Sequence, residues 1–136
     1  MNEYKKKTIK RDDLLFPELS YKIVGSAFDV HNNLGSGHYE KYYQKALAES
    51  FSKNQLKFKE QTYFPLKFNN KIIGKNFIDF LVEDKVIVEI KKDSRFAKSH
   101  IDQVLEYLKL TNLQLAILIN FGSENVSFKR IINLNS

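Results

Sequence analysis

The sequence predicts a single α/β domain whose mixed β-sheet is flanked by helices. Two apolar, β-rich runs at 77–82 and 86–91 flank the polar turn at 83–85, which indicates a β-hairpin. Segments with helical spacing precede this hairpin, and another separates it from a nearly continuous apolar run at 113–121. A strand, a helix and a second buried strand in this order favour a right-handed crossover with parallel strands. A chain of 136 residues is large enough for one core.

Composition narrows the classes of function. The net charge of +6 and the pI near 9.4 favour a polyanionic partner such as nucleic acid. The absence of cysteine excludes disulfides and thiolate metal sites and suits a cytoplasmic location. No run approaches the roughly 18 apolar residues that span a bilayer, so no membrane partner is expected. Three scattered histidines and the lack of a nucleophile elbow exclude zinc and Ser/His hydrolases.

Residues 1–19 are predicted to be a basic N-terminal arm and lead-in, and residues 20–136 the single domain. Five of the first eleven residues are basic, and they form either an arm that binds phosphate groups or a solvated terminus: Lys5, Lys6, Lys7, Lys10 and Arg11. Ser20 is the expected N-cap of a first helix that ends at Leu34, where Gly35 and Gly37 permit a reversal.

A second helix is expected over about 39–54, with an apolar stripe of Tyr43, Ala46, Leu47 and Phe51. Glu40 precedes Tyr43 by three residues and therefore falls on the same inward row. A carboxylate that faces a core needs a cation or several hydrogen-bond donors. A glutamate in the first turn is also favoured by the helix dipole, so both interpretations stay open.

The β-rich segment 58–68, a turn at 69–71 and a short return at 72–73 extend the sheet as a meander. Its aromatic side chains could stack on bases, although packing within the sheet explains them more simply.

The central hairpin carries the candidate chemistry. A three-residue loop places Val82 opposite Val86, and counting back along the strands places Asp79 opposite Glu89. One face is then wholly apolar: Ile78, Phe80, Val82, Val86, Val88 and Ile90. Two opposed carboxylates destabilise a hairpin, so a cation is expected between them. The alternative is a surface hairpin on which Glu89 and Lys91 form an ion pair.

The segment after this hairpin is basic and leads into a third helix at about 99–111. Lys92, Arg95 and Lys98 either form a solvated surface or hold a phosphate backbone. His100, Gln103 and Tyr107 share one helix face beside the core stripe, where they either face the candidate site or face solvent. The last strands are expected at 113–121 and 126–134.

Two motifs carry a resemblance to a known family. Asp79 followed by Glu89-Ile90-Lys91 resembles the PD-(D/E)xK nuclease superfamily, although Ile78 stands where the proline of the motif is expected. Residues 37–43 fit G-x-x-E-x-x-Y, the signature of the GxxExxY protein family, which is assigned to the same superfamily. The resemblance extends over about 13–132 and includes the segments 20–25, 88–91 and 118–122.

The resemblance implies a restriction-endonuclease-like fold and a set of site residues. Glu40 is expected to join Asp79 and Glu89 at a metal ion, with the backbone carbonyl of Ile90 as a further ligand. Gln103 and Tyr107 resemble an auxiliary motif that positions the site and the substrate, and Tyr43 completes the family signature.

Phosphodiester hydrolysis requires an in-line water, neutralisation of charge at phosphorus and help for the leaving oxygen. Hard divalent ions bound by carboxylates supply these, so Mg²⁺ or Mn²⁺ is the expected cofactor. Lys91 would orient or deprotonate the water, or stabilise the developing charge. The expected function is a metal-dependent deoxyribonuclease, with a homodimer as one candidate assembly. The alternative is a non-catalytic nucleic-acid-binding or protein-interaction domain that retains the fold.

Overall fold

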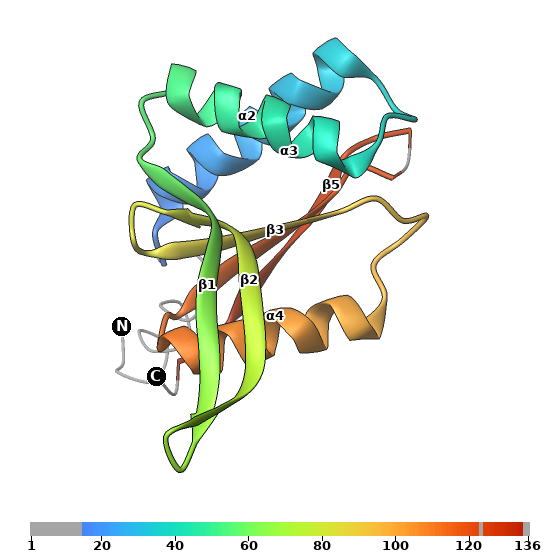
Figure 1. Cartoon of the computed structure of the whole chain (residues 1–136). Coiled ribbons are helices and arrows are strands. Elements are labelled where there is room, and N and C mark those ends of the chain that lie inside the picture. Colours follow the sequence, from blue (N-terminus) through green and yellow to red (C-terminus); the bar gives the residue numbers. More distant parts are fainter. Residues whose placement is uncertain (1–14, 123, 135–136) are drawn as a thin grey trace, which may run out of the picture.

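The computed structural model describes residues 15–122 and 124–134. The basic stretch predicted at the N-terminus therefore lies outside the described residues. Helices α2 (Pro17–Leu34) and α3 (Glu40–Lys53) come first, and α4 (Lys98–Thr111) falls between the third and fourth strands (Figure 1). Across the described ranges, no helix is both long enough and apolar enough to cross a membrane.

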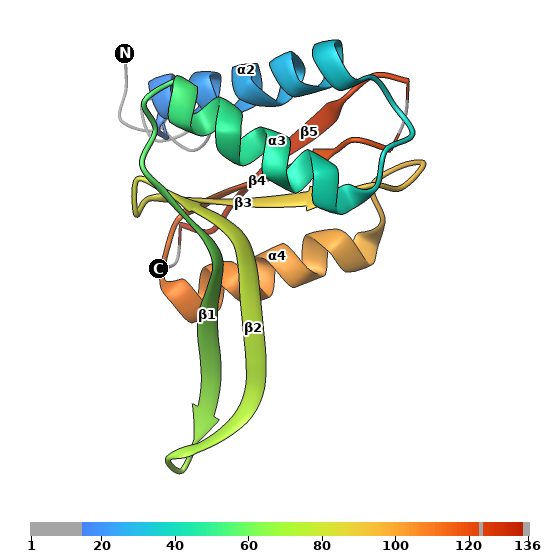
Figure 2. The same ribbon diagram turned by 45° about the horizontal axis from the view of Figure 1, so that its top comes forward.

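Five strands form one sheet in the order of the chain: β1 (Phe58–Phe68), β2 (Lys71–Val82), β3 (Val86–Lys91), β4 (Leu115–Asn120) and β5 (Ser127–Ile132). β3 and β4 are parallel, and the other neighbouring pairs are antiparallel. The predicted mixed sheet and the parallel crossover through α4 are confirmed. Helices α2 and α3 cover one face of the sheet, and α4 covers the other (Figure 2).

Each face of the sheet has its own hydrophobic core. Val86, Val88 and Ile90 of β3 pack toward α2 and α3, whereas Ile87 packs in the cluster that includes α4. Successive side chains of a strand point to opposite faces, so this alternation directs Glu89 toward the α4 side. Glu89 is only 3% exposed there, which places an ionisable carboxyl group inside the protein.

The β1–β2 hairpin leaves the plane of the sheet. The β2–β3 ladder ends at Phe80–Val88, and beyond it β2 turns away so that the hairpin projects past α4 (Figures 1 and 2). The prediction of one common apolar face is therefore wrong at Ile78, which packs in the α4 cluster while Phe80 packs against α2 and α3. A strand that bends between two residues carries them into different layers.

Several helices and strands begin or end at other residues than the sequence predicted. Helix α2 begins at Pro17 and not after Ser20, because proline is favoured in the first turn, where no intrahelical N–H bond is lost. The short return expected at 72–73 is the start of the continuous strand β2, which passes through Gly74. The pairing of β1 with β2 is interrupted near there by a register shift between Leu66 and Lys67.

Candidate active site

Asp79 and Glu89 meet where the β2–β3 ladder ends. Val82 lies opposite Val86, as predicted from the turn. Beyond Phe80, side chains replace the regular backbone bonds between the strands. The Asp79 N–H donates to Glu89 Oε1 at 2.7 Å, and the Ile90 N–H donates to Asp79 Oδ2 at 2.9 Å. Each carboxyl group is thus held by the backbone of the opposite strand, which orients both acids in one place.

Two glutamines brace Asp79 from neighbouring elements. The Gln61 amide donates to Asp79 Oδ1 at 3.0 Å, and the Gln44 amide of α3 donates to the Asp79 carbonyl at 3.3 Å. The sequence analysis missed both residues. Gln61 could have been found from the register of β1 on β2, since it falls between Glu60, opposite Phe80, and Thr62, opposite Ile78.

The surroundings of Glu89 strongly perturb its ionisation. Burial is the main cause that raises the pKa of Glu89 to about 8, and the nearby Asp79 carboxylate raises it further. The hydrogen bond from the Asp79 N–H and the charge of Lys91 act in the opposite direction. A buried acid beside a second acid binds its proton tightly unless a cation takes the proton's place.

Glu40 opens helix α3 at the rim of this pair. Its pKa is raised first by burial and then by the Asp79 carboxylate, whereas Lys91 lowers it. Asp93 raises the pKa of Glu40 and His100 lowers it, so these two groups also act on its carboxyl group. Glu40 is nevertheless exposed, and no group of three or more histidine, cysteine or acidic side chains that could hold a metal ion occurs among the described residues. Asp79 and Glu89, in contrast, are each hydrogen-bonded to the backbone of the other's strand.

Tyr43 holds the turn that precedes Glu40. Its hydroxyl donates to the Gly35 carbonyl at 2.6 Å, and its ring stacks on Phe121 with 4.6 Å between centroids. Tyr43 is fully buried, so its contacts position the start of α3 and are made with the protein interior.

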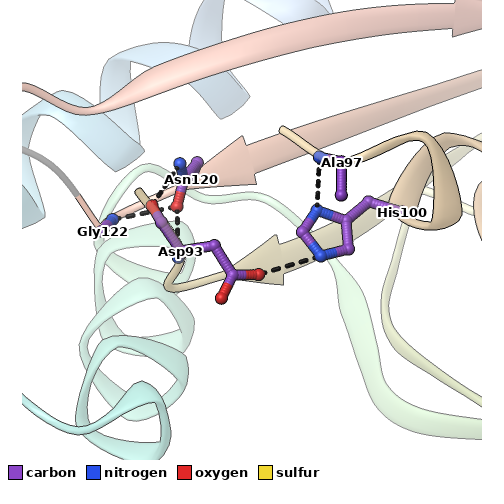
Figure 3. A network of polar contacts seen from close by, with 5 residues as sticks. All are labelled: Asp93, Ala97, His100, Asn120 and Gly122. Carbon is purple, nitrogen blue, oxygen red and sulfur yellow. Dashed lines mark hydrogen bonds and ion pairs between the residues drawn. The ribbon is translucent and has the colours of Figure 1, made fainter. Parts of the chain in front are cut away.

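The loop between β3 and α4 is fixed by a polar network (Figure 3). Asn120, at the end of β4, accepts from the Asp93 N–H at 3.0 Å and donates to the Asp93 carbonyl at 2.8 Å. It also accepts from the Gly122 N–H at 2.9 Å. A Cβ atom at Gly122 would lie 2.0 Å from the Asp93 carbonyl oxygen, so this approach requires glycine.

The other end of the loop is held by His100 of α4. His100 Nδ1 accepts from the Ala97 N–H at 3.2 Å, which leaves Nε2 to donate to Asp93 Oδ2 at 2.9 Å (Figure 3). The sequence analysis missed Asp93 and Asn120. The available signal was a lone asparagine within the apolar run 113–121, followed two residues later by glycine.

The remaining predicted site residues surround the acidic pair. Tyr107 is buried, donates weakly to the Phe77 carbonyl at 3.5 Å and is also hydrogen-bonded to Gln103. Burial raises the pKa of Tyr107 to about 12, and the charges of Glu89 and Asp79 add to this effect. The solvent-facing interpretation of this helix face therefore fails for Tyr107, whose side chain packs into the interior from α4.

Three basic residues lie at the end of β3 and in the loop after it. Lys91 ends β3 and is partly exposed, Lys92 lies 5.9 Å from the centre of the Tyr39 ring, and Arg95 is exposed on the loop. Among these, Lys91 is close enough to Glu40 and Glu89 for its charge to lower the pKa of both carboxyl groups.

The fold and the site together define an α/β domain in which the buried Glu89 is hydrogen-bonded to Asp79 where β2 and β3 separate, with Lys91 nearby and a basic loop after it. This chain belongs to the PD-(D/E)XK nuclease superfamily, whose family model matches residues 17–131. No curated protein matches the sequence.

Solved structures share the fold at low sequence identity. The structure of SSO0001 matches with a TM-score of 0.55 and 16% identity, covering 68% of this chain and 49% of that one. The chain thus spans about half the length of SSO0001. LHK-Exo in complex with dAMP matches with a TM-score of 0.50 and 13% identity, covering 86% and 83% of the two chains. LHK-Exo is described as an alkaline exonuclease from Laribacter hongkongensis. At these identities the similarity concerns the fold alone.

Proposed function

We propose that this protein is a divalent-metal-dependent deoxyribonuclease that hydrolyses phosphodiester bonds. The observation that carries the proposal is the pair formed by the buried Glu89 and the half-buried Asp79, held by reciprocal side-chain-to-backbone bonds in a member of a nuclease superfamily. A buried carboxylate beside a second carboxylate destabilises the fold. Its presence is explained if a cation binds there.

The donor set fits Mg²⁺ or Mn²⁺. Both ions prefer oxygen ligands, and Mg²⁺ commonly binds to only one or two carboxylates while keeping several waters. Asp79 and Glu89 would hold the ion, with Glu40 and the Ile90 carbonyl as additional ligands. A bound divalent ion polarises the scissile phosphate and activates a water molecule.

The chain's own residues prepare the site for this chemistry. The Ile90 N–H and the Gln61 amide keep the Asp79 carboxylate oriented. The charge of Lys91 lowers the pKa of both Glu40 and Glu89, so its ammonium group favours their ionised forms and would stabilise added negative charge on a phosphate. Lys92 and Arg95 are proposed to contact the phosphate backbone on either side of the cleaved bond.

Finer assignments rest on the sequence motifs. The spacing of Gly37, Glu40 and Tyr43 supports membership of the GxxExxY family and a resolvase- or recombination-type activity. The cytoplasmic location and the homodimer remain predictions from the sequence.

Purified protein incubated with duplex, single-stranded and branched DNA tests the function, with Mg²⁺, Mn²⁺ or EDTA. Asp79→Asn and Glu89→Gln should abolish cleavage by weakening metal binding, and both should retain DNA binding because each removes a negative charge. Glu49→Gln, which changes an exposed glutamate on α3, is the matched control and should cleave normally.

The alternative of a non-catalytic nucleic-acid-binding or protein-interaction domain has one observation in its favour. The part of the chain that the structure describes has no preformed group of three metal-ligating side chains. If no DNA is cut and calorimetry detects no binding of Mg²⁺ or Mn²⁺, the nuclease proposal is wrong and this alternative stands.

A further inference from the structure

The projecting β1–β2 hairpin has two unlike faces. Phe64 and Ile78 pack in the α4 cluster, whereas Tyr63 and Phe77 are 42% and 51% exposed. Tyr63 and Phe77 are direct partners across the strands, with 5.1 Å between ring centroids. Packing within the protein therefore explains the inner ring of Phe64. It does not explain the outer pair, Tyr63 and Phe77, because both rings are largely exposed.

The outer pair lies close to the acidic site. On β2, Phe77 is two residues from Asp79, and on β1, Tyr63 is two residues from Gln61, which binds Asp79. Two residues of a strand span about 7 Å. The Phe77 carbonyl also accepts from Tyr107, which is itself influenced by Glu89 and Asp79. The distance from the acidic pair to the aromatic pair is thus about one nucleotide step.

The charge of the hairpin complements nucleic acid. Between Gln61 and Ile78 the chain has no acidic residue and carries Lys67, Lys71 and Lys75. Lys75 pairs with Pro65 two positions along the strands from the Tyr63–Phe77 pair, so it lies on the same face of the hairpin as these rings. Lys71 pairs with the exposed Phe68 near the tip. Lysines interleaved with exposed aromatic rings are the pattern that binds single strands, since the cations track phosphates while the rings stack on bases.

On the basis of the nuclease function proposed above, we propose that the outer face of the β1–β2 hairpin binds an unpaired segment of the substrate beside the cleaved bond. An unpaired base stacks on the Tyr63–Phe77 pair, and Lys75 and Lys67 contact the adjacent phosphates. The substrate class is therefore DNA with unpaired nucleotides at the site, such as a single strand, a flap or a branch. A base within an intact duplex is already stacked and must first be extruded.

A second copy of the chain is the competing occupant of this exposed face. A two-fold interface would bring the same patch of both copies together and place three lysines against three lysines, with no acidic partner between Gln61 and Ile78. Repulsion between like charges opposes that arrangement, whereas a polyanion relieves it.

The chain contains no tryptophan, so one substitution creates a specific fluorescent reporter. In Phe77→Trp, single-stranded or flapped DNA should quench the indole emission by stacking, and blunt duplex of equal length should not. Tyr21→Trp is the control, because Tyr21 is 82% exposed on α2, which lies away from the projecting part of the hairpin (Figures 1 and 2). The measurements are made in EDTA, so they report binding independently of cleavage.

Alanine variants measure how much the aromatic pair and the lysines contribute to DNA affinity. Tyr63→Ala with Phe77→Ala should weaken binding to single-stranded DNA about 5–150-fold per stacked base lost and leave duplex binding within about twofold. Replacing Lys67, Lys71 and Lys75 by alanine should reduce the slope of log affinity against log salt by about 2 for single strands. Replacing Lys22, Lys45 and Lys53 on α2 and α3 removes the same charge from exposed positions and should leave the slope nearly unchanged. Circular dichroism checks that each variant folds.

The outcomes separate this proposal from the proposed activity. If DNA is cleaved but the aromatic and lysine variants bind single strands like the parent, the hairpin proposal is wrong and the nuclease proposal stands. If quenching and the alanine effects occur without any cleavage, the nuclease proposal is wrong and the hairpin remains a binding surface for single-stranded DNA. If the variants instead convert a dimer to a monomer in sedimentation while DNA binding is unchanged, the hairpin is a self-association surface and the proposal is overturned.

Discussion

Replacing Glu89 by glutamine should disable the site and stabilise the fold in alkaline solution. The pKa of Glu89 rises from its ordinary 4.5 to about 8 on folding. Between these values the unfolded chain binds fewer protons than the folded protein, so stability falls as the pH rises through this window. Below it, both states hold the proton and the effect vanishes. Above it, the full cost of a buried carboxylate is present.

The size of the effect follows from the two pKa values. A pKa difference of one corresponds to 1.36 kcal/mol, so the shift from 4.5 to about 8 corresponds to roughly 5 kcal/mol. Glutamine is neutral at every pH, can still accept from the Asp79 N–H and can donate to the Asp79 carboxylate. The free energy of unfolding of Glu89→Gln should therefore match that of the parent near pH 4 and exceed it by several kcal/mol at pH 9.

Urea denaturation in EDTA at pH 4, 6.5 and 9 measures this difference, with Glu49→Gln as the matched loss of an exposed carboxylate. Adding Mg²⁺ at pH 9 should stabilise the parent and not Glu89→Gln, because only the parent binds the ion at this site. A difference in stability that stays constant with pH would refute the assignment of a buried, proton-retaining Glu89.

Four further substitutions test the site and its support. Lys91→Ala should lose DNA cleavage in gel assays while calorimetry still detects the metal, because the ammonium group is not a ligand. Asn120→Ala should lower the free energy of unfolding in urea by about 2–5 kcal/mol, since the Asp93 and Gly122 N–H groups lose their buried acceptor. Gly122→Ala should destabilise by about 1–3 kcal/mol in thermal melts, because its Cβ collides with the Asp93 backbone. Gly25→Ala, which meets nothing within 4 Å in helix α2, should instead stabilise by up to about 1 kcal/mol. Normal stability in the Gly122 variant would contradict this account of the loop, and a destabilised Gly25 variant would contradict the open space at that position of α2.

Local patterns determined the elements and the register of the central hairpin. Alternation and a three-residue turn are enough to place Val82 opposite Val86, because strand side chains alternate with a strict period of two. The apolar run before Asn120 was enough to predict a buried parallel strand. The proximity of Asp79 and Glu89 followed from the same counting, so the sequence was sufficient for the acidic pair.

Contacts between distant segments were decided only by the tertiary structure. The Asn120–Asp93 bonds join residues 27 positions apart, and no periodicity in the chain encodes such a pair. The bend of β2 separates Ile78 from Phe80. It also leaves Phe77 exposed together with Tyr63, although packing within the sheet was the simpler explanation that the sequence offered for Tyr63. Periodicity reports which residues share a face of one element. Which layer covers that face, and where a strand leaves its neighbour, depends on how all the elements pack together.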